Sequence, residues 1–269
     1  MQSLAQRIWS PASHTHIGDL AWQRRQHLGR ESEWNTKLWE DGNTVVAWGW
    51  LDGSHLDLLV DPERPELADE VLEWAEQARE VVVSDAEKHL IAALERHGYR
   101  AQADPHTSHY MGRELAEIQR PVLPPGFTAR PVGDGDLARR VEVHRKAWHP
   151  SRVTEDSYRT VMAAWPYEKN LDWVVEAPDG RFAANCLIWP DRRNGVGEIE
   201  PVGTDPAFRG LGLAKAVCGK ALRALRETGI ERAVVCPVES NPAAMSLYSG
   251  LGFDTYARTT TLVRTRPHG

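Results

Sequence analysis

The segment 205–214, with the sequence DPAFRGLGLA, contains residue types that bind an anion. The first four N–H groups of a helix have no partner within the helix, and the helix dipole makes that end partly positive. Gly210 and Gly212 let the backbone approach a diphosphate closely, and Arg209 adds a charge-assisted contact. Lys215 excludes a dinucleotide fingerprint, and the absence of GK[ST] excludes a Walker loop. We therefore predict a pyrophosphate site of another kind, with a plain glycine-rich turn as the alternative.

Two acidic residues precede this segment on a predicted strand. Glu198 and Glu200 are two positions apart, so their carboxylates project from one face. An amine attacks a carbonyl only when neutral, and an acidic pair both attracts the cationic amine and accepts its proton. The alternative is a solvated strand face, although charged residues are depleted from central strands.

The spacing Arg209-x-x-Gly212-x-Ala214 after a strand resembles the acyl-CoA signature R/Q-x-x-G-x-G/A of the GNAT superfamily of N-acyltransferases. The stretch 241–253, NPAAMSLYSGLGF, is similar to the family's second motif, an Asn followed by LYxxxGF. The tandem arrangement and the segment 197–203, GEIEPVG, resemble mycothiol synthase and related two-domain actinobacterial acetyltransferases. The resemblance implies an α/β protein of two tandem GNAT-like domains, each with a mixed, mostly antiparallel sheet flanked by helices. The N-terminal copy would be degenerate.

The resemblance also implies acetyl-CoA as co-substrate and no metal. The pantetheine arm would lie along the strand before the signature, and the pyrophosphate would lie on the signature itself. Asn241 would contact the pantetheine arm or, alternatively and compatibly, cap the next helix. The other cofactor-binding residues implied are Val202, Gly203, Thr204, Arg209, Gly210, Leu211, Gly212, Leu213 and Ala214.

Three catalytic residues follow from the same resemblance. Glu200, nine residues before Arg209, matches the usual position of the base, and Glu198 matches the position that holds the amine in mycothiol synthase. Either carboxylate fits either role. Tyr248 would protonate the departing thiolate, since a phenol with a pKa near 10 is a suitable acid for this step. Its alternative role is that of a half-buried helix aromatic.

Periodicity and turn signals place these residues on elements. The apolar residues of 212–228 recur every four positions and Gly229 follows them, which predicts an amphipathic helix. The other elements predicted in this half are helix 136–148, strands 171–177, 181–189 and 197–204, strand 233–238, helix 242–251 and strand 253–263.

The first half repeats this order of elements. Asp-Pro occurs at 61 and 205, and Gly followed by an aromatic residue occurs at 98 and 252, which indicates duplication. In the first copy, however, Pro65 stands in the place of Arg209 and Leu94 in that of Tyr248. We therefore expect that it cannot bind CoA in the usual way and instead supplies structure or part of the substrate pocket. Its predicted elements are strands 45–51 and 55–60, helix 66–79, strand 81–83 and helix 85–97.

The proline-rich segment 119–126 predicts an inter-domain connector. It divides the chain into an N-terminal domain (1–120), a linker (121–126) and a catalytic domain (127–269). Residues 1–122 hold 21 acidic and 12 basic side chains, a charge of −9, and residues 123–269 hold 17 and 20, a charge of +3. The positive half suits a nucleotide cofactor, but no dense basic stripe indicates nucleic acid.

The 269 residues, 41% apolar and 26% charged, have the composition of a folded protein and not of a disordered or coiled-coil chain. No leader-like start and no apolar run of about 20 residues is present, so we expect a cytoplasmic protein without a membrane partner. Cys186, Cys218 and Cys236 lack metal or disulfide spacing and are expected to be reduced packing residues.

Histidine and aromatic residues supply weaker signals. The pairs His14/His16 and His106/His109 are expected to be surface histidines and not metal ligands. Histidines 144 and 149 flank the predicted helix 136–148. Five aromatic residues are candidates for an acceptor site, with core packing as the alternative for each: Trp148, Tyr158, Trp165, Tyr167 and Trp189.

Together these features predict transfer of an acetyl group from acetyl-CoA to a primary amine by direct attack. The expected acceptor is small and cationic, such as an amino sugar, an amino acid derivative, a polyamine or an aminated antibiotic, with mycothiol synthesis a lesser alternative. A non-catalytic acyl-CoA-binding regulatory protein and a protein N-terminal acetyltransferase are the other candidates. The sequence leaves open whether the chain is a monomer or a homodimer.

Overall fold

The computed structural model describes residues 1–102, 107–120 and 122–264. The strands form one 12-stranded sheet in the order β1-β2-β3-β4-β12-β6-β11-β10-β9-β8-β7, with β5 paired to β12. Among the described strands, β3/β4 and β10/β11 pair in parallel and the remaining pairs are antiparallel. The mixed, mostly antiparallel sheet predicted from the sequence is therefore confirmed.

The C-terminal half contains every element predicted for it, with small shifts at the ends. Strand β7 and helix α6 were not predicted, since β7 is short and α6 has Ser157 where a capping box usually has Glu or Gln. The elements are β7 (Thr128–Pro131), α5 (Leu137–Ala147), α6 (Glu155–Met162), β8 (Asp172–Glu176), β9 (Phe182–Asp191), β10 (Val196–Thr204), α7 (Leu213–Glu227), β11 (Arg232–Val235), α8 (Pro242–Gly250) and β12 (Asp254–Val263). Short 3₁₀ turns lie at Lys169–Leu171 and Pro206–Phe208.

In the N-terminal half, the helix predicted over 66–79 is shorter than expected. It ends at Trp74 because the backbone leaves helical geometry at Ala75 and turns toward the next strand. The elements are α1 (Gln2–Ile8), α2 (Ile17–Arg25), β1 (Trp34–Asp41), β2 (Thr44–Asp52), β3 (His55–Val60), α3 (Leu67–Trp74), β4 (Glu80–Ser84), α4 (Lys88–Arg96), β5 (Arg100–Ala101) and β6 (His109–Glu114), with a 3₁₀ turn at Glu31–Glu33.

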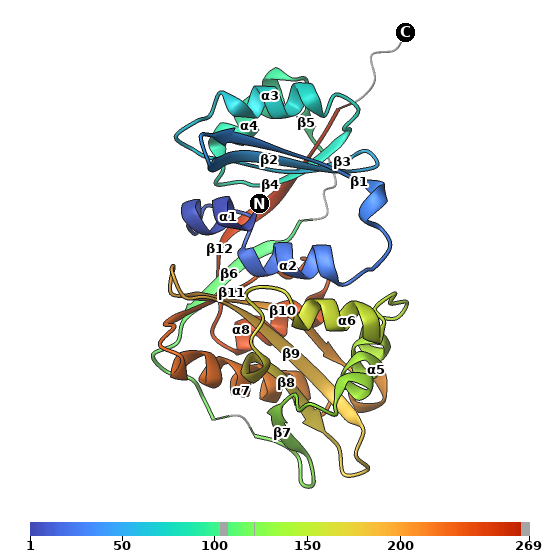
Figure 1. Ribbon diagram of the computed structural model, residues 1–269. Coiled ribbons are helices and arrows are strands. Elements are labelled where there is room, and N and C mark those ends of the chain that lie inside the picture. Colours follow the sequence, from blue (N-terminus) through green and yellow to red (C-terminus); the bar gives the residue numbers. More distant parts are fainter. Residues whose placement is uncertain (103–106, 121, 265–269) are drawn as a thin grey trace.

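The internal duplication appears directly in the order of elements. The series β3-α3-β4-α4-β6 in the first half corresponds to β10-α7-β11-α8-β12 in the second, and each series contains a parallel pair. The division of the chain at 121–126 stays a prediction, because strands from before this segment pair with strands from after it in both parts of the sheet. Strand β6 lies between β11 and β12, and β12 continues to pair with β4 in the first half (Figure 1).

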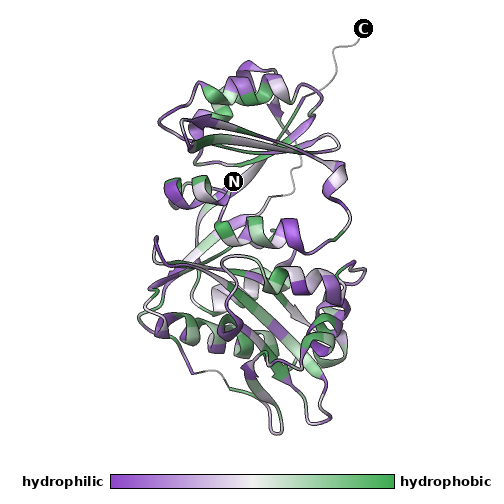
Figure 2. Cartoon of the chain, viewed as in Figure 1, coloured by the Kyte–Doolittle hydropathy of each residue, from purple (hydrophilic) through white to green (hydrophobic). Residues whose placement is uncertain are grey.

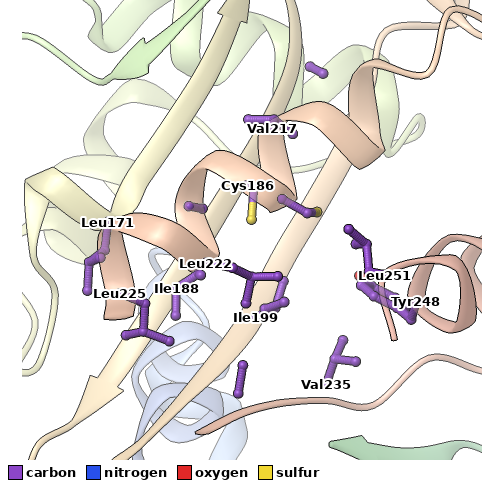
Figure 3. Packing of buried hydrophobic residues seen from close by; sticks show 14 of the residues in the cluster. Leu171, Cys186, Ile188, Ile199, Val217, Leu222, Leu225, Val235, Tyr248 and Leu251 are labelled. Carbon is purple, nitrogen blue, oxygen red and sulfur yellow. The ribbon is translucent and has the colours of Figure 1, made fainter. Parts of the chain in front are cut away.

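Two large hydrophobic cores support the halves separately. The first packs β2, β3, β4, α3 and α4, and the second packs β9, β10 and α7 with residues of α8. Val217, Ala221 and Leu225 are fully buried in the second core, as the four-residue periodicity of α7 predicts. Figure 3 shows Tyr248 and Leu251 among the residues of this core. Cys186 and Cys218 are free and buried within it, which confirms their packing role.

Helices α1 and α2 lie between the two halves (Figure 1). On one side α2 packs Leu20 against Trp48 and Trp50 of β2, and on the other it packs Trp22 against Trp189 and its neighbours. Because apolar residues occupy both sides of α2, no single apolar stripe marks it in the sequence or in Figure 2. None of the helices in the described part of the chain combines the length and apolar content needed to span a bilayer.

Candidate active site

A cavity of about 1440 Å³ lies between the two halves. It opens where β10 and β11 separate, because their pairing covers only three positions, from Val196 to Glu198. Beyond this point β10 continues to Thr204 beside β9 alone. The cavity wall combines β10, the 208–212 segment and the starts of α7 and α8 with residues of α2, β2 and β3.

One end of the cavity has the properties of an anion site. Gly210 and Gly212 have φ values of +81° and +73°, a conformation that side-chain-bearing residues rarely adopt. Gly212 is the N-cap of α7, and no side chain caps this helix end. Arg209 and Lys215 supply cationic side chains to the same wall. Exposed helix N–H groups beside two cations fit a diphosphate.

The remaining residues predicted for the cofactor lie beside this end, with one exception. Val202, Gly203 and Thr204 line the cavity, and a Cβ on Gly203 would lie 2.6 Å from the Cβ of Ala147. Asn241 also lines it and caps α8, since its side chain accepts the Ala244 N–H at 3.1 Å. Leu213 and Ala214 line it as well. Leu211 is 46% exposed and lies outside the wall formed by the described residues.

Three carboxylates face the other part of the cavity. Glu198 and Glu200 are joined there by Asp19 of α2, which the sequence analysis missed. Glu198 is buried, and its Oε2 accepts the backbone N–H of Asp19 at 2.8 Å. The backbone carbonyl of Glu200 accepts the indole N–H of Trp189 at 2.7 Å. Glu198 and Glu200 both line this cavity, and the register of β10 against β9 shifts between Ile199 and Val202. That their carboxylates act together in one site stays a prediction.

Burial and neighbouring negative charges raise the pKa values of Glu200 and Asp19. Burial raises the pKa of Glu200 well above its usual range, and the charges of Asp19 and Glu198 raise it further. Burial raises the pKa of Asp19 to about 8, with contributions from the charges of Glu198 and Asp57. A carboxylate with a raised pKa is a stronger base, so the site suits proton abstraction from a cationic amine.

Tyr248 lies on the cavity wall with its ring buried and packed edge-on against Phe253 at 5.8 Å. Burial is the main reason that the pKa of Tyr248 is well above its usual value, and the neighbouring cysteines and Glu200 raise it further. The phenol therefore keeps its proton and is available as a hydrogen-bond donor.

The expectation of surface histidines was wrong for the described members of both pairs. His14 is largely buried and its Nδ1 lies 2.6 Å from Glu87, while His16 is buried at the N-cap of α2. His109 is buried against Thr255, and His106 lies outside the described residues. Their burial follows from the packing of both halves around α2 and β6. No group of three or more His, Cys, Asp or Glu in the described chain is arranged to hold a metal.

Of the five aromatic candidates, Trp148 alone lines the cavity within the described chain. Tyr158 and Tyr167 donate hydrogen bonds to Asp172, at 2.6 and 3.1 Å, and Trp165 is exposed elsewhere. Three tryptophans of the N-terminal half line the cavity instead: Trp34, Trp48 and Trp50. No motif marks them, because only tertiary packing brings β1 and β2 to the cavity.

In the first copy, the segment that corresponds to the anion site has an acidic side chain in ion pairs at the start of its helix. Asp69 in the first turn of α3 pairs with Arg96 at 2.8 Å and His97 at 3.0 Å, and Leu94 is fully buried in the core. None of residues 61–70 contributes to the cavity wall. That this copy cannot bind CoA in the usual way stays a prediction.

Comparisons with known proteins point to the same part of the chain. A model described as the acetyltransferase (GNAT) family matches residues 139–253. The mycothiol acetyltransferase of Kineococcus radiotolerans is 35% identical over 148 residues, which are 53% of this chain and 48% of that protein. The mycothiol acetyltransferase of Actinosynnema mirum is 32% identical over 153 residues, 54% of this chain and 51% of that protein. The chain spans about half the length of these curated relatives.

Solved structures extend the similarity to the whole fold. A GCN5-related N-acetyltransferase from Sphaerobacter thermophilus has a TM-score of 0.65 at 18% identity, covering 97% of this chain and 89% of that one. A tandem GNAT protein from the clavulanic acid biosynthesis pathway has a TM-score of 0.64 at 15% identity, covering 97% and 91%. Residues 139–253 therefore are a domain of the acetyltransferase (GNAT) family, within a chain that has a tandem GNAT fold.

Proposed function

We propose that this protein transfers an acetyl group from acetyl-CoA to the primary amine of a small, cationic acceptor. The observation that carries the proposal is a single cavity with two chemically different parts. One part has the uncapped N-terminus of α7 with Arg209, and the other has Asp19, Glu198 and Glu200. A diphosphate and an ammonium group are the complementary ligands.

Acetyl-CoA supplies the activated acetyl group. The N–H groups of Gly212, Leu213 and Ala214, together with Arg209, would hold its pyrophosphate. The open edge of β10 from Val202 to Thr204 would bond the amides of the pantetheine arm, and Asn241 would meet the arm from α8. This placement directs the thioester toward Tyr248 and the carboxylates that share the cavity.

The acceptor class follows from charge. Within the described chain, none of the three carboxylates forms an ion pair with Lys or Arg. A cationic amine would relieve their mutual repulsion, whereas a neutral or anionic acceptor would not. Amino sugars, amino acid derivatives, polyamines and aminated antibiotics fit this requirement. A mycothiol-related acceptor also belongs among the candidates, because the curated relatives have that name.

The two glutamates would have different roles in the reaction. Glu198, held by the Asp19 N–H, would bind the ammonium group. Glu200, whose carboxylate has no hydrogen-bond partner among the described residues, would accept the proton, helped by its raised pKa. The neutral amine then attacks the thioester carbonyl carbon, forming the C–N bond. The C–S bond breaks as Tyr248 donates a proton to sulfur. The ammonium loses two protons, one through Glu200 to solvent and one that restores Tyr248.

The test is release of free thiol from acetyl-CoA in the presence of amines from each class. The expected result is turnover with cationic primary amines and none with matched alcohols. Arg209→Ala should raise the KM for acetyl-CoA, whereas exposed Arg145→Ala, outside the cavity, should leave it unchanged. CoA binding without turnover of any amine would favour a regulatory protein. An absence of CoA binding would refute the proposal.

A further inference from the structure

Helix α2 meets the active site at its N-terminus. His16 is its N-cap, and His16 Nδ1 accepts the Gly18 N–H at 3.0 Å. The next N–H in the helix, that of Asp19, donates to Glu198 Oε2 at 2.8 Å, and the same oxygen lies 3.1 Å from His16 Nδ1. The first turn of a helix near the start of the chain therefore holds the carboxylate of a strand in the C-terminal half.

The same turn also contacts the residue that holds Glu200. A Cβ on Gly18 would lie only 2.2 Å from the Cβ of Trp189, so a side chain cannot be added without moving one of the two elements. Trp189 is fully buried, and its indole N–H donates to the Glu200 carbonyl at 2.7 Å. The close approach of α2 to Trp189 is thus coupled to the position of the second glutamate.

Packing outside the site fixes α2 in this place. Trp22, one turn further along, is buried with Tyr158 and Trp189, and its ring meets that of Tyr158 at 6.5 Å. The side chain of Gln2 donates to the Ile17 carbonyl at 2.8 Å. These contacts hold α2 from both sides, so its first turn presents fixed groups to β10.

We propose that α2 is a positioning element of the acceptor site, which orients Glu198 through the Asp19 N–H, at a helix end that His16 caps, and orients Glu200 through Gly18 and Trp189. This inference rests on the proposed function. The 209–214 loop is placed by β10 and α7, elements of the C-terminal half. Helix α2 therefore affects acceptor turnover and not acetyl-CoA binding. The N-terminal half thus contributes to the catalytic site.

The experiment compares Gly18→Ala, His16→Leu and His16→Asn with the wild-type protein. Asn keeps a side chain that caps the helix, whereas Leu does not. Arg25→Gln, an exposed change at the far end of the same helix, is the matched control. The measurements are the KM for acetyl-CoA, the kcat and KM for the acceptor with their pH profiles, and hydrogen exchange of peptides from α2.

Gly18→Ala and His16→Leu should lower kcat/KM for the acceptor by about 10- to 100-fold, the usual effect of misplaced catalytic groups. Both should speed exchange in α2, and the KM for acetyl-CoA should stay within about 2-fold in each. His16→Asn should recover most of the loss. If Gly18→Ala does not fold, the comparison of His16→Leu with His16→Asn still tests the inference. The inference would be overturned if His16→Leu had the same acceptor kinetics and the same hydrogen exchange in α2 as the wild-type protein. A wild-type protein that acetylates no amine refutes the proposed function, while the exchange comparison still tests the role of α2.

Discussion

The backbone N–H of Asp19 donates a 2.8 Å hydrogen bond to Oε2 of Glu198, although 179 residues separate them in the chain. This contact joins α2 to strand β10 of the C-terminal half. The cavity consequently has walls from both halves, with the 208–212 segment on one and Trp48 and Trp50 of β2 on the other. Residues from both halves of the chain are therefore needed to form this cavity.

Tyr248→Phe should lower kcat by about 10-fold or more, because the departing thiolate loses its acid. Acetyl-CoA affinity, measured by calorimetry, should change little. Tyr99→Phe is the control, since the Tyr99 hydroxyl bonds the Ala78 carbonyl at 3.0 Å in the N-terminal core. It should cost about 1 kcal/mol of stability without affecting turnover. An unchanged kcat in Tyr248→Phe would remove this residue from the mechanism.

The pH profile should reveal the coupling of Glu200 to Asp19. A base works only when ionised, so kcat/KM should rise with pH through the raised pKa of Glu200. Asp19→Asn removes a negative charge that raises this pKa, and the rise should therefore move to lower pH. Asp57→Asn is the control, because Asp57 acts on Asp19 and is not among the groups that shift Glu200. Equal profiles for wild type and Asp19→Asn would contradict the coupling.

Gly212→Ala should weaken CoA binding roughly 10-fold, because a left-handed conformation costs about 1–2 kcal/mol for a residue with a Cβ, and the free loop relieves this cost by leaving the conformation that aligns the helix N–H groups with the diphosphate. Space is not the cause, since no atom lies within 4 Å of a Cβ built there. Gly229→Ala is a matched control just beyond the other end of α7, with φ +89° and equally open surroundings. Both variants should lose similar stability, but only Gly212→Ala should change CoA affinity in calorimetry.

Stability should fall as pH rises above the ordinary range of a carboxyl. Asp19 has a folded-state pKa of about 8 against an ordinary value of 3.8, so the native state binds the extra proton between these values. Its contribution to stability is complete at low pH and is lost as pH approaches about 8. His14, with its raised pKa, and Glu200 act in the same direction. Asp19→Asn should flatten the dependence in urea unfolding between about pH 5 and 9, and an unchanged slope would contradict it.

Apart from β7 and α6, the elements of the C-terminal half were predictable because each has a strong local signal. The periodicity of α7, the glycine at its end and the Pro-Asp-Gly turn between β8 and β9 are all local features of the chain. Helix α2 lacked such a signal, since its apolar residues face two partners that lie far apart in the sequence. The same reason explains why His14 and His16 were expected on the surface and are instead buried.

The amino-acid sequence by itself determined the duplicated order of elements, the glycine turn at Gly210 and Gly212, and the acidic pair Glu198 and Glu200. The turn and the acidic pair each depend on residues within a few positions of one another, and the duplication appears in the order of local signals along the chain. Only the tertiary structure added Asp19, His16 and the tryptophans of β2 to the site. Their position depends on how α2 packs between two cores, and that packing is set by side chains more than 100 residues apart.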